Sequence, residues 1–198
     1  TVSARDRYIP LLLTLSVVVA DQIIKAIVVA NLPLERPVSV LGEVVRLTYV
    51  QNSAIAFSVG RNIPTEMRRV LFLILPLMAI SLITAYYLTT TELSRLQRWL
   101  LATILGGGAG NYVDRVMRPH GVVDFVDVKF YGILGFDRWP TFNLADSAVV
   151  GSLIIPAMQR AGYSGPFSAA LTAVTSTIGG IIPPSIIMIL IASALSLS

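Results

Sequence analysis

The stretch IPLLLTLSVVVADQIIKAIVVA, residues 9–30, is an apolar run that contains only two charged side chains, Asp21 and Lys25. A helix of about 20 residues crosses the hydrocarbon core of a bilayer, so this run predicts a membrane-spanning helix. The two charges stand four residues apart and therefore share one face of that helix. Charged residues inside a span face a protein interior or a cavity, because lipid solvates them poorly. We therefore expect Asp21 and Lys25 to form an ion pair, to support a functional site, or both.

The composition of the whole chain extends this prediction. Of the 198 residues, 55% are apolar and only 13% are charged, whereas a soluble domain carries roughly a quarter charged residues. Three further apolar runs are long enough for spans: Val70–Leu88, Trp99–Met117 and Phe142–Met158. A fifth apolar region, Phe167–Leu197, is interrupted by paired glycines and paired prolines. The predicted fold class is mainly α: a polytopic membrane protein with a four-helix transmembrane bundle and an extra C-terminal hydrophobic segment.

The residue types present exclude several classes of site. The chain has no cysteine, and its one histidine, His120, lies outside the predicted spans. Thiol catalysis is therefore excluded, and neither a histidine-based zinc site nor a Ser-His-Asp triad is expected. The net charge of +4 is spread over the loops between apolar runs, which favours membrane lipid headgroups over nucleic acid as a partner. We expect a monomer without metal or cofactor.

Two loops between the predicted spans contain strand-like segments. The first loop, Asn31–Glu66, contains Val44–Gln51, which is rich in β-branched and aromatic residues. The third loop, Arg118–Pro140, contains the alternating segment Val126–Phe130. Two spans separate these loops, so both lie on one side of the membrane, where they can form one small β-rich cap. The two loops hold more Arg and Lys than the opposite side, so the positive-inside rule alone places them in the cytoplasm.

Two aspartates lie at the membrane ends that adjoin this cap. Asp124 follows the third predicted span and Asp146 begins the fourth, so both belong to the same face of the bilayer. Each aspartate taken alone is more often a helix cap or a solvated loop charge. Two close carboxylates share one proton, however, and such a pair can activate water and polarise a scissile carbonyl. The pair therefore predicts aspartic-peptidase chemistry, which needs no metal.

Other polar residues surround these aspartates in the sequence. Asn143 lies close to Asp146, and Asn111 and Arg115 end the third predicted span. Arg115 either snorkels to lipid headgroups or holds a substrate carbonyl. The glycines at 106 and 110 in the same span form a GxxxG motif, which lets a second helix approach closely.

Five motifs in order resemble those of the lipoprotein signal peptidase family, also called signal peptidase II or aspartic peptidase family A8. The resemblance covers about residues 8–150. Its motifs are DQIIK (21–25), NSAIAF (52–57), GGGAGNYVDR (106–115), VVDF (122–125) and FNLADS (142–147). One departure is Ala54, where the family usually has glycine.

This resemblance implies an activity, a location and a set of site residues. The implied activity is removal of signal peptides from diacylglyceryl-modified prolipoproteins, by cleavage before the lipidated cysteine with water that the aspartate dyad activates. The implied location is the cell inner membrane, with the active site at the periplasmic face and both termini in the cytoplasm. The implied residues are Asp124 and Asp146 for catalysis, Asn52, Asn111, Arg115 and Asn143 for substrate binding, and Asp21, Lys25 and Asp114 for support.

The C-terminal part resembles a different family. Residues 151–198 are similar to a fragment of the large permease subunit of TRAP-type transporters, through segments such as STIGGIIPPS (176–185). In that family such a Gly- and Pro-interrupted segment resembles a broken helix at a transport site. The expected division is a peptidase-like domain, 1–150, and a permease-like tail, 151–198, joined near Ala148–Gly151. A transporter permease fragment and an inactive fusion are the two alternative functions.

Overall fold

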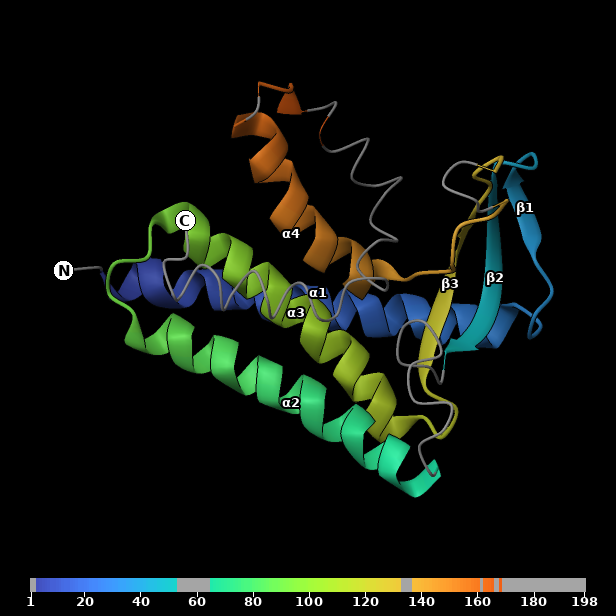
Figure 1. Ribbon diagram of the computed structural model, residues 1–198, viewed down its shortest axis with the longest axis horizontal. Coiled ribbons are helices and arrows are strands. Elements are labelled where there is room, and N and C mark those ends of the chain that lie inside the picture. Colours follow the sequence, from blue (N-terminus) through green and yellow to red (C-terminus); the bar gives the residue numbers. More distant parts are fainter. Residues whose placement is uncertain (1–2, 53–64, 133–136, 161, 166–167, 169–198) are drawn as a thin grey trace.

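The computed structural model describes residues 3–52, 65–132, 137–160, 162–165 and 168. Long helices make up most of this part, and a small sheet lies at one end of them (Figure 1). The elements in chain order are α1 (Ala4–Asn31), β1 (Val38–Leu41), β2 (Val45–Asn52), α2 (Thr65–Thr89), α3 (Arg95–Met117), β3 (Val122–Val128) and α4 (Leu144–Arg160). The predicted mainly helical class with a β-rich part is confirmed.

Helix α3 packs against the other three helices through its glycines. A Cβ atom at Gly106 would lie 2.8 Å from the Cβ of Val17 in α1, and one at Gly107 would lie 2.4 Å from the carbonyl oxygen of Ala145 in α4. Because glycine has no side chain, both helix backbones come within reach of α3. The close approach predicted for the GxxxG motif is confirmed. The motif alone did not indicate the neighbouring contact with α4.

The sheet joins the two loops that were predicted to meet. Its strand order is β1-β2-β3 with antiparallel pairing, and the β2–β3 register sets Val50 opposite Asp124. Strand β1 was not predicted, and β3 begins four residues earlier than the predicted segment Val126–Phe130. Six of the seven β3 residues are buried, and a strand covered on both faces lacks the alternation of a half-exposed one. Asp124 therefore lies inside a strand rather than in a loop.

The distribution of side chains is inverted relative to a soluble protein. Five apolar side chains on α1 are between 46% and 63% exposed, namely Leu12, Leu15, Val19, Ile23 and Ile27. On the same helix the side chains of Asp21 and Lys25 are 0% exposed. Helix α1 and residues Val70–Thr89 of α2 are long and apolar enough to cross a membrane, and most of their residues are not buried inside the protein. This pattern is that of helices surrounded by lipid.

Within the described residues, α3 and α4 do not meet the same criterion of length and hydropathy. Helix α3 has too few apolar residues because it carries a run of glycines and the charged residues Arg95, Arg98, Asp114 and Arg115. Helix α4 has only 17 residues up to Arg160. Hydropathy therefore identifies two spans in the described part of the chain, where the sequence predicted four.

A buried arginine holds the helices together at the end opposite the sheet (Figure 1). Arg98 is 0% exposed, and its guanidinium donates to the carbonyl oxygens of Tyr87 (3.4 Å) and Thr90 (3.0 Å) at the end of α2. The Tyr87 hydroxyl in turn donates to the carbonyl oxygen of Arg7 (2.6 Å). A cation at the C-terminal end of a helix is favoured by the helix dipole. Arg98 thus connects α3, α2 and α1.

Candidate active site

Asn143 links the two predicted catalytic aspartates. Its side-chain amide donates to Oδ1 of Asp124 (2.7 Å), and its backbone N–H donates to Oδ2 of Asp146 (3.2 Å). Asn143 is 0% exposed, so both contacts lie inside the protein. The aspartates come from β3 and α4, and the structure brings them to two sides of one asparagine.

Asp146 also takes part in the cap of α4. Its backbone N–H donates to Oδ1 of Asn143 (3.0 Å), while its own carboxylate accepts from the Asn143 backbone. This reciprocal pair is a capping box, which an acceptor side chain three residues after the N-cap completes. The N-terminus of a helix favours negative charge, so it supports an ionised carboxylate here. The cap and site interpretations of Asp146 are therefore compatible.

Asp124 lies in a more enclosed position than Asp146. It is 2% exposed, whereas Asp146 is only partly buried. Its second oxygen, Oδ2, accepts from the side-chain amide of Asn52 at the end of β2 (2.9 Å). Burial, followed by repulsion from the Asp146 carboxylate, raises the pKa of Asp124 to about 7. One proton is therefore retained at this site close to neutral pH.

Asn111 is the third asparagine that contacts the pair. Its amide nitrogen donates to Oδ1 of Asp146 (2.8 Å). Its carbonyl oxygen accepts from Asn143 (3.0 Å) and from the ammonium of Lys25 (2.9 Å). The four residues Asn111, Asn143, Asp124 and Asp146 thus form one continuous hydrogen-bonded cluster.

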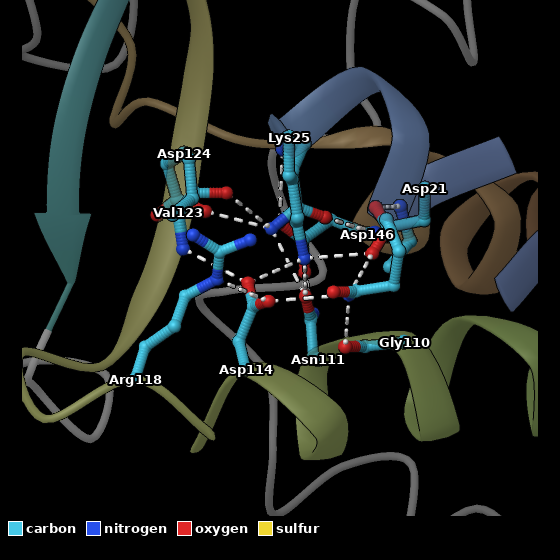
Figure 2. A network of polar contacts seen from close by, with 12 residues as sticks. Asp21, Lys25, Gly110, Asn111, Asp114, Arg118, Val123, Asp124 and Asp146 are labelled. Carbon is cyan, nitrogen blue, oxygen red and sulfur yellow. Dashed lines mark hydrogen bonds and ion pairs between the residues drawn. The ribbon is translucent and has the colours of Figure 1, made fainter. Parts of the chain in front are cut away.

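A buried charge network lies directly behind this cluster (Figure 2). The ammonium of Lys25 is 2.8 Å from Oδ2 of Asp21 and 2.9 Å from Oδ2 of Asp114, and all three side chains are 0% exposed. The predicted pair between Asp21 and Lys25 is confirmed. Asp21 also accepts from the backbone N–H of Ala145 (3.1 Å), so it attaches the first turn of α4 to α1.

Asp114 connects three elements through a single carboxylate. It accepts from the backbone N–H of Val123 in β3 (3.0 Å), from Gln22 in α1 (3.1 Å) and from Arg118 (3.0 Å). Neither Gln22 nor Arg118 was predicted as a site residue. The four-residue spacing between Asp114 and Arg118 was an available signal for that ion pair. The role of Gln22 depends on the approach of α3, which the local sequence does not encode.

Arg115 is separate from this network. Within the described residues it makes no ion pair, and its guanidinium lies 5.9 Å from the ring centroid of Phe72 in α2. It is within electrostatic reach of the carboxylates of Asp146, Asp124 and Asp114. Arg115 therefore supplies a positive charge beside the dyad whose hydrogen-bonding capacity is not used by the network.

Two groups of predicted positions cannot be placed. Residues 53–57 of the second motif, including Ala54, lie outside the described residues, and so do the permease-like segments from 169 onward. Asn52 is described and lies at the end of β2, where it contacts Asp124.

Comparison with protein families gives two matches along the chain. The model for signal peptidase (SPase) II matches residues 13–160, about three quarters of the chain. The model for the DctM component of the tripartite ATP-independent periplasmic transporter matches residues 143–198. The two matches overlap over residues 143–160, which include Asp146 and the whole of α4. Both predicted resemblances are confirmed.

Individual relatives agree with the first match. The chain is 47% identical over 146 residues to the lipoprotein signal peptidase of Treponema denticola, which covers 74% of this chain and 84% of that protein. It is 44% identical to the lipoprotein signal peptidase of Treponema pallidum, over 76% of this chain and 83% of that one. The corresponding protein of Borrelia duttonii is 41% identical, over 76% and 89%.

Solved structures share the fold. A bacterial membrane enzyme determined by the in meso method at 2.3 Å resolution superposes with a TM-score of 0.62 and 23% identity, over 77% of this chain and 88% of that one. A second such structure, at 1.9 Å, has a TM-score of 0.63 and 21% identity, over 78% and 94%. The helices and the small sheet thus have the arrangement of a known membrane enzyme. Together with the extent of the sequence matches, this shows that the chain belongs to the signal peptidase II family of aspartic peptidases.

Proposed function

We propose that the protein is an intramembrane aspartic endopeptidase that removes signal peptides from diacylglyceryl-modified prolipoproteins, with Asp124 and Asp146 as its catalytic dyad. The observation that carries this proposal is the Asn143 bridge, which holds a carboxylate of β3 and a carboxylate of α4 in one buried cluster. Family membership supports the type of reaction. The geometry supports the choice of residues.

The chemistry follows from the shared proton. Two neighbouring carboxylates do not both ionise at low cost, so at neutral pH one remains protonated. The ionised carboxylate takes a proton from water while the water oxygen attacks the scissile carbonyl carbon. The protonated carboxyl donates to the carbonyl oxygen, and a proton then passes to the departing amine as the C–N bond breaks. Every step uses groups of the chain and water.

Substrate positioning involves the polar groups around the dyad. The amides of Asn52, Asn111 and Asn143 hold the carboxylates in place by donating to them. Arg115 has a positive charge beside the dyad and makes no ion pair with any described residue, which suits a substrate carbonyl as it becomes an oxyanion. This interpretation replaces snorkelling, because the guanidinium lies over the ring of Phe72 and faces three carboxylates.

The membrane arrangement is part of the proposal. All four helices cross the inner membrane, and the sheet forms a cap on the periplasmic face. The buried charges of α1 and α3 support spans that face one another, since charge in a span requires a partner. The sheet lies at one end of α1 (Figure 1), and its strand β3 carries Asp124. With the sheet in the periplasm, the active site opens at the periplasmic face. The protein acts as a monomer, with membrane lipids and the prolipoprotein as its partners.

The dyad is tested by isosteric removal of each charge. Asp124→Asn and Asp146→Asn should each reduce cleavage of a lipidated precursor by the purified protein by at least about 10³-fold, since loss of a dyad member removes general acid–base catalysis. Asp137→Asn is the matched control, because Asp137 is an exposed residue that follows the same sheet. Near-normal cleavage by either dyad variant, with the protein inserted and folded, rejects the assignment.

The DctM match over residues 143–198 raises the alternative of a transporter permease fragment. We propose instead that residues 151–198 are a passenger segment added to a peptidase domain, 1–150, and not a working transporter. Deletion of residues 161–198 should leave cleavage intact. Loss of a solute uptake activity on deletion, with unchanged cleavage, would instead support a transporter, and no activity in the full chain would support an inactive fusion.

A further inference from the structure

Lys25 uses all three of its N–H donors on neighbours that lie around the dyad. Its ammonium contacts Oδ2 of Asp21 (2.8 Å), Oδ2 of Asp114 (2.9 Å) and Oδ1 of Asn111 (2.9 Å). The side chain is 0% exposed, so no bulk water competes for these donors. The contacts with the two aspartates are ion pairs that neutralise buried charge. The third reaches the cluster that contains the aspartates (Figure 2).

That third contact determines which way the Asn111 amide faces. Its oxygen lies between two donors, the Lys25 ammonium and the amide nitrogen of Asn143 (3.0 Å). Lysine has no acceptor, so a flipped Asn111 amide would set its NH2 group against two other donors. The Asn143 amide cannot turn to relieve this, because its own oxygen accepts from the backbone of Asp146 and its nitrogen donates to Asp124. The Asn111 NH2 group must therefore point at Asp146.

The result is unequal surroundings for the two carboxylates. Asp146 receives the oriented Asn111 amide on one oxygen (2.8 Å) and a backbone N–H at the start of α4 on the other (3.2 Å). Both donors and the helix dipole favour its ionised form. Asp124 also accepts from two amides, those of Asn52 and Asn143, but it lies in a strand, away from a helix terminus, and is nearly enclosed. The Asp146 residue also has the larger exposed fraction of the two.

The charges that face Asp146 come from every element packed around it. They are Lys25 and Asp21 from α1, Asp114 and Arg115 from α3, and Asp124 from β3. The buried group behind it, Asp21, Asp114, Lys25 and Arg118, has two positive and two negative charges. Its net charge is zero, and removal of one charge of each sign keeps it zero, so such a variant separates the orientation of Asn111 from a change in net charge.

We propose that Lys25 is a positioning residue that makes the dyad asymmetric: by fixing the Asn111 amide it holds Asp146 as the ionised, water-activating carboxylate and leaves the shared proton on Asp124. This inference rests on the proposed function of the dyad.

The test compares the wild type with a double variant of the same net charge. Asp21→Asn combined with Lys25→Met removes one negative and one positive charge from the buried group, so it keeps the net charge of the wild type while removing the contact to Asn111. The single variant Asp21→Asn is the folding control, because an asparagine still accepts from Ala145 and Lys25 remains. The readout is the pH dependence of kcat for cleavage of a lipidated precursor by the full chain, together with Tm.

In the double variant the acid limb of this profile should move to higher pH by about one unit, because the ionised Asp146 loses a fixed donor. The basic limb, which reports the proton on Asp124, should stay in place. The same two substitutions made in an Asn111→Leu background should not move the acid limb, because no amide remains to be oriented. Such background dependence identifies action through Asn111.

Two results would overturn the role proposed for Lys25 without overturning the dyad. Lower kcat and Tm with an unmoved acid limb would show that Lys25 is only structural. An equal shift with and without Asn111 would show that Lys25 acts as a charge, and either result overturns the inference while the dyad stands. Near-normal activity of Asp124→Asn or Asp146→Asn would overturn the proposed function first.

Discussion

Asp124 carries its carboxyl group in a strand that is covered on both faces and bordered by a second carboxylate. Of its two oxygens, one accepts from Asn143 and one from Asn52. Neutral amide donors offset only part of the cost of burying a charge. The group therefore retains a proton to about pH 7, and this proton is what lets a carboxylate pair act as acid and base together.

The pH dependence of stability follows from this raised pKa. A carboxyl whose folded pKa lies above its unfolded value favours the folded state at pH below the unfolded value, about 4, and this contribution is lost as pH rises through about 7. The asparagine of Asp124→Asn cannot ionise, so at pH 8 the variant should have a higher Tm than the wild type. The increase should be about 2–4 °C for each kcal/mol that the wild type spends on burying the charged carboxylate. The difference should shrink at pH 5.

Thermal melts in detergent at the two pH values measure this effect. Asp137→Asn serves as the control, because its carboxyl is exposed and its removal should leave the wild-type pH dependence unchanged. Activity should show the matching loss on the basic side, since the wild type loses the shared proton as pH rises past about 7. Equal Tm values of Asp124→Asn and the wild type at pH 8 would contradict the proposal that burial holds this proton.

At the scale of elements, contacts from two other helices hold the first turn of α4 in place. Asp21 of α1 accepts from the backbone of Ala145, and Gly107 of α3 lies against the carbonyl of the same residue. The capping box with Asn143 completes the turn. Because Asp146 belongs to this turn, its position depends on how closely α3 and α4 pack.

A methyl group added at Gly107 should displace α4. Its Cβ would lie 2.4 Å from the Ala145 carbonyl oxygen and 2.7 Å from a methyl group of Val149, so the helices must separate. Overpacking of this kind costs about 1–3 kcal/mol, and we expect Gly107→Ala to lose most activity as well as stability. Precursor cleavage and Tm measure the two effects.

Gly108→Ala is the matched control for this prediction. Among the described residues, its Cβ would meet only the side chain of Ile80, at 3.4 Å, which is an ordinary contact. Both substitutions raise helix propensity equally, so the difference between them isolates packing against α4. Similar activities for the two variants would show that the α3–α4 approach does not position Asp146.

At the scale of the whole molecule, the proposed sidedness places the sheet in the periplasm and the turn between α2 and α3 in the cytoplasm. The chain has no native cysteine, so single cysteines report topology directly. Glu43, in the turn between β1 and β2, and Glu92, in the turn before α3, are both exposed. Glu43→Cys should react with a membrane-impermeant maleimide in cells whose outer membrane alone is permeable.

Glu92→Cys should react only after the inner membrane is also opened. Labelling in the opposite order would invert the topology and agree with the Arg and Lys count of the loops. Several cations on the sheet side are paired in the folded protein: Arg46 and Arg138 both contact Asp127 (2.7 Å each), and Lys129 lies 3.7 Å from Glu43. These pairs give the cations of the sheet a structural role, but the positive-inside rule counts Arg and Lys and not net charge, so the labelling pattern decides the sidedness.

Several features could be predicted from the sequence because they depend on local pattern. Long apolar runs indicated the helices, and the four-residue spacing of Asp21 and Lys25 indicated their ion pair. The GxxxG spacing indicated a close helix contact, and the order of five motifs indicated the family and the two aspartates. Each of these signals is contained in a short stretch of chain whose geometry repeats in every helix or motif.

Other features depended on tertiary structure because they join residues far apart in the chain. The Lys25 ammonium contacts Asp21, Asp114 and Asn111 at once, which requires α1 and α3 to pack in one register. The enclosure of Asp124 requires β2 to cover β3. Hydropathy identified only two spans in the described part of the chain. Helix α3 contains glycines and buried charges in place of apolar residues, and partners on other helices offset the cost of burying those charges. Local sequence specifies which groups are present, and only the packed helices determine which of them share a proton.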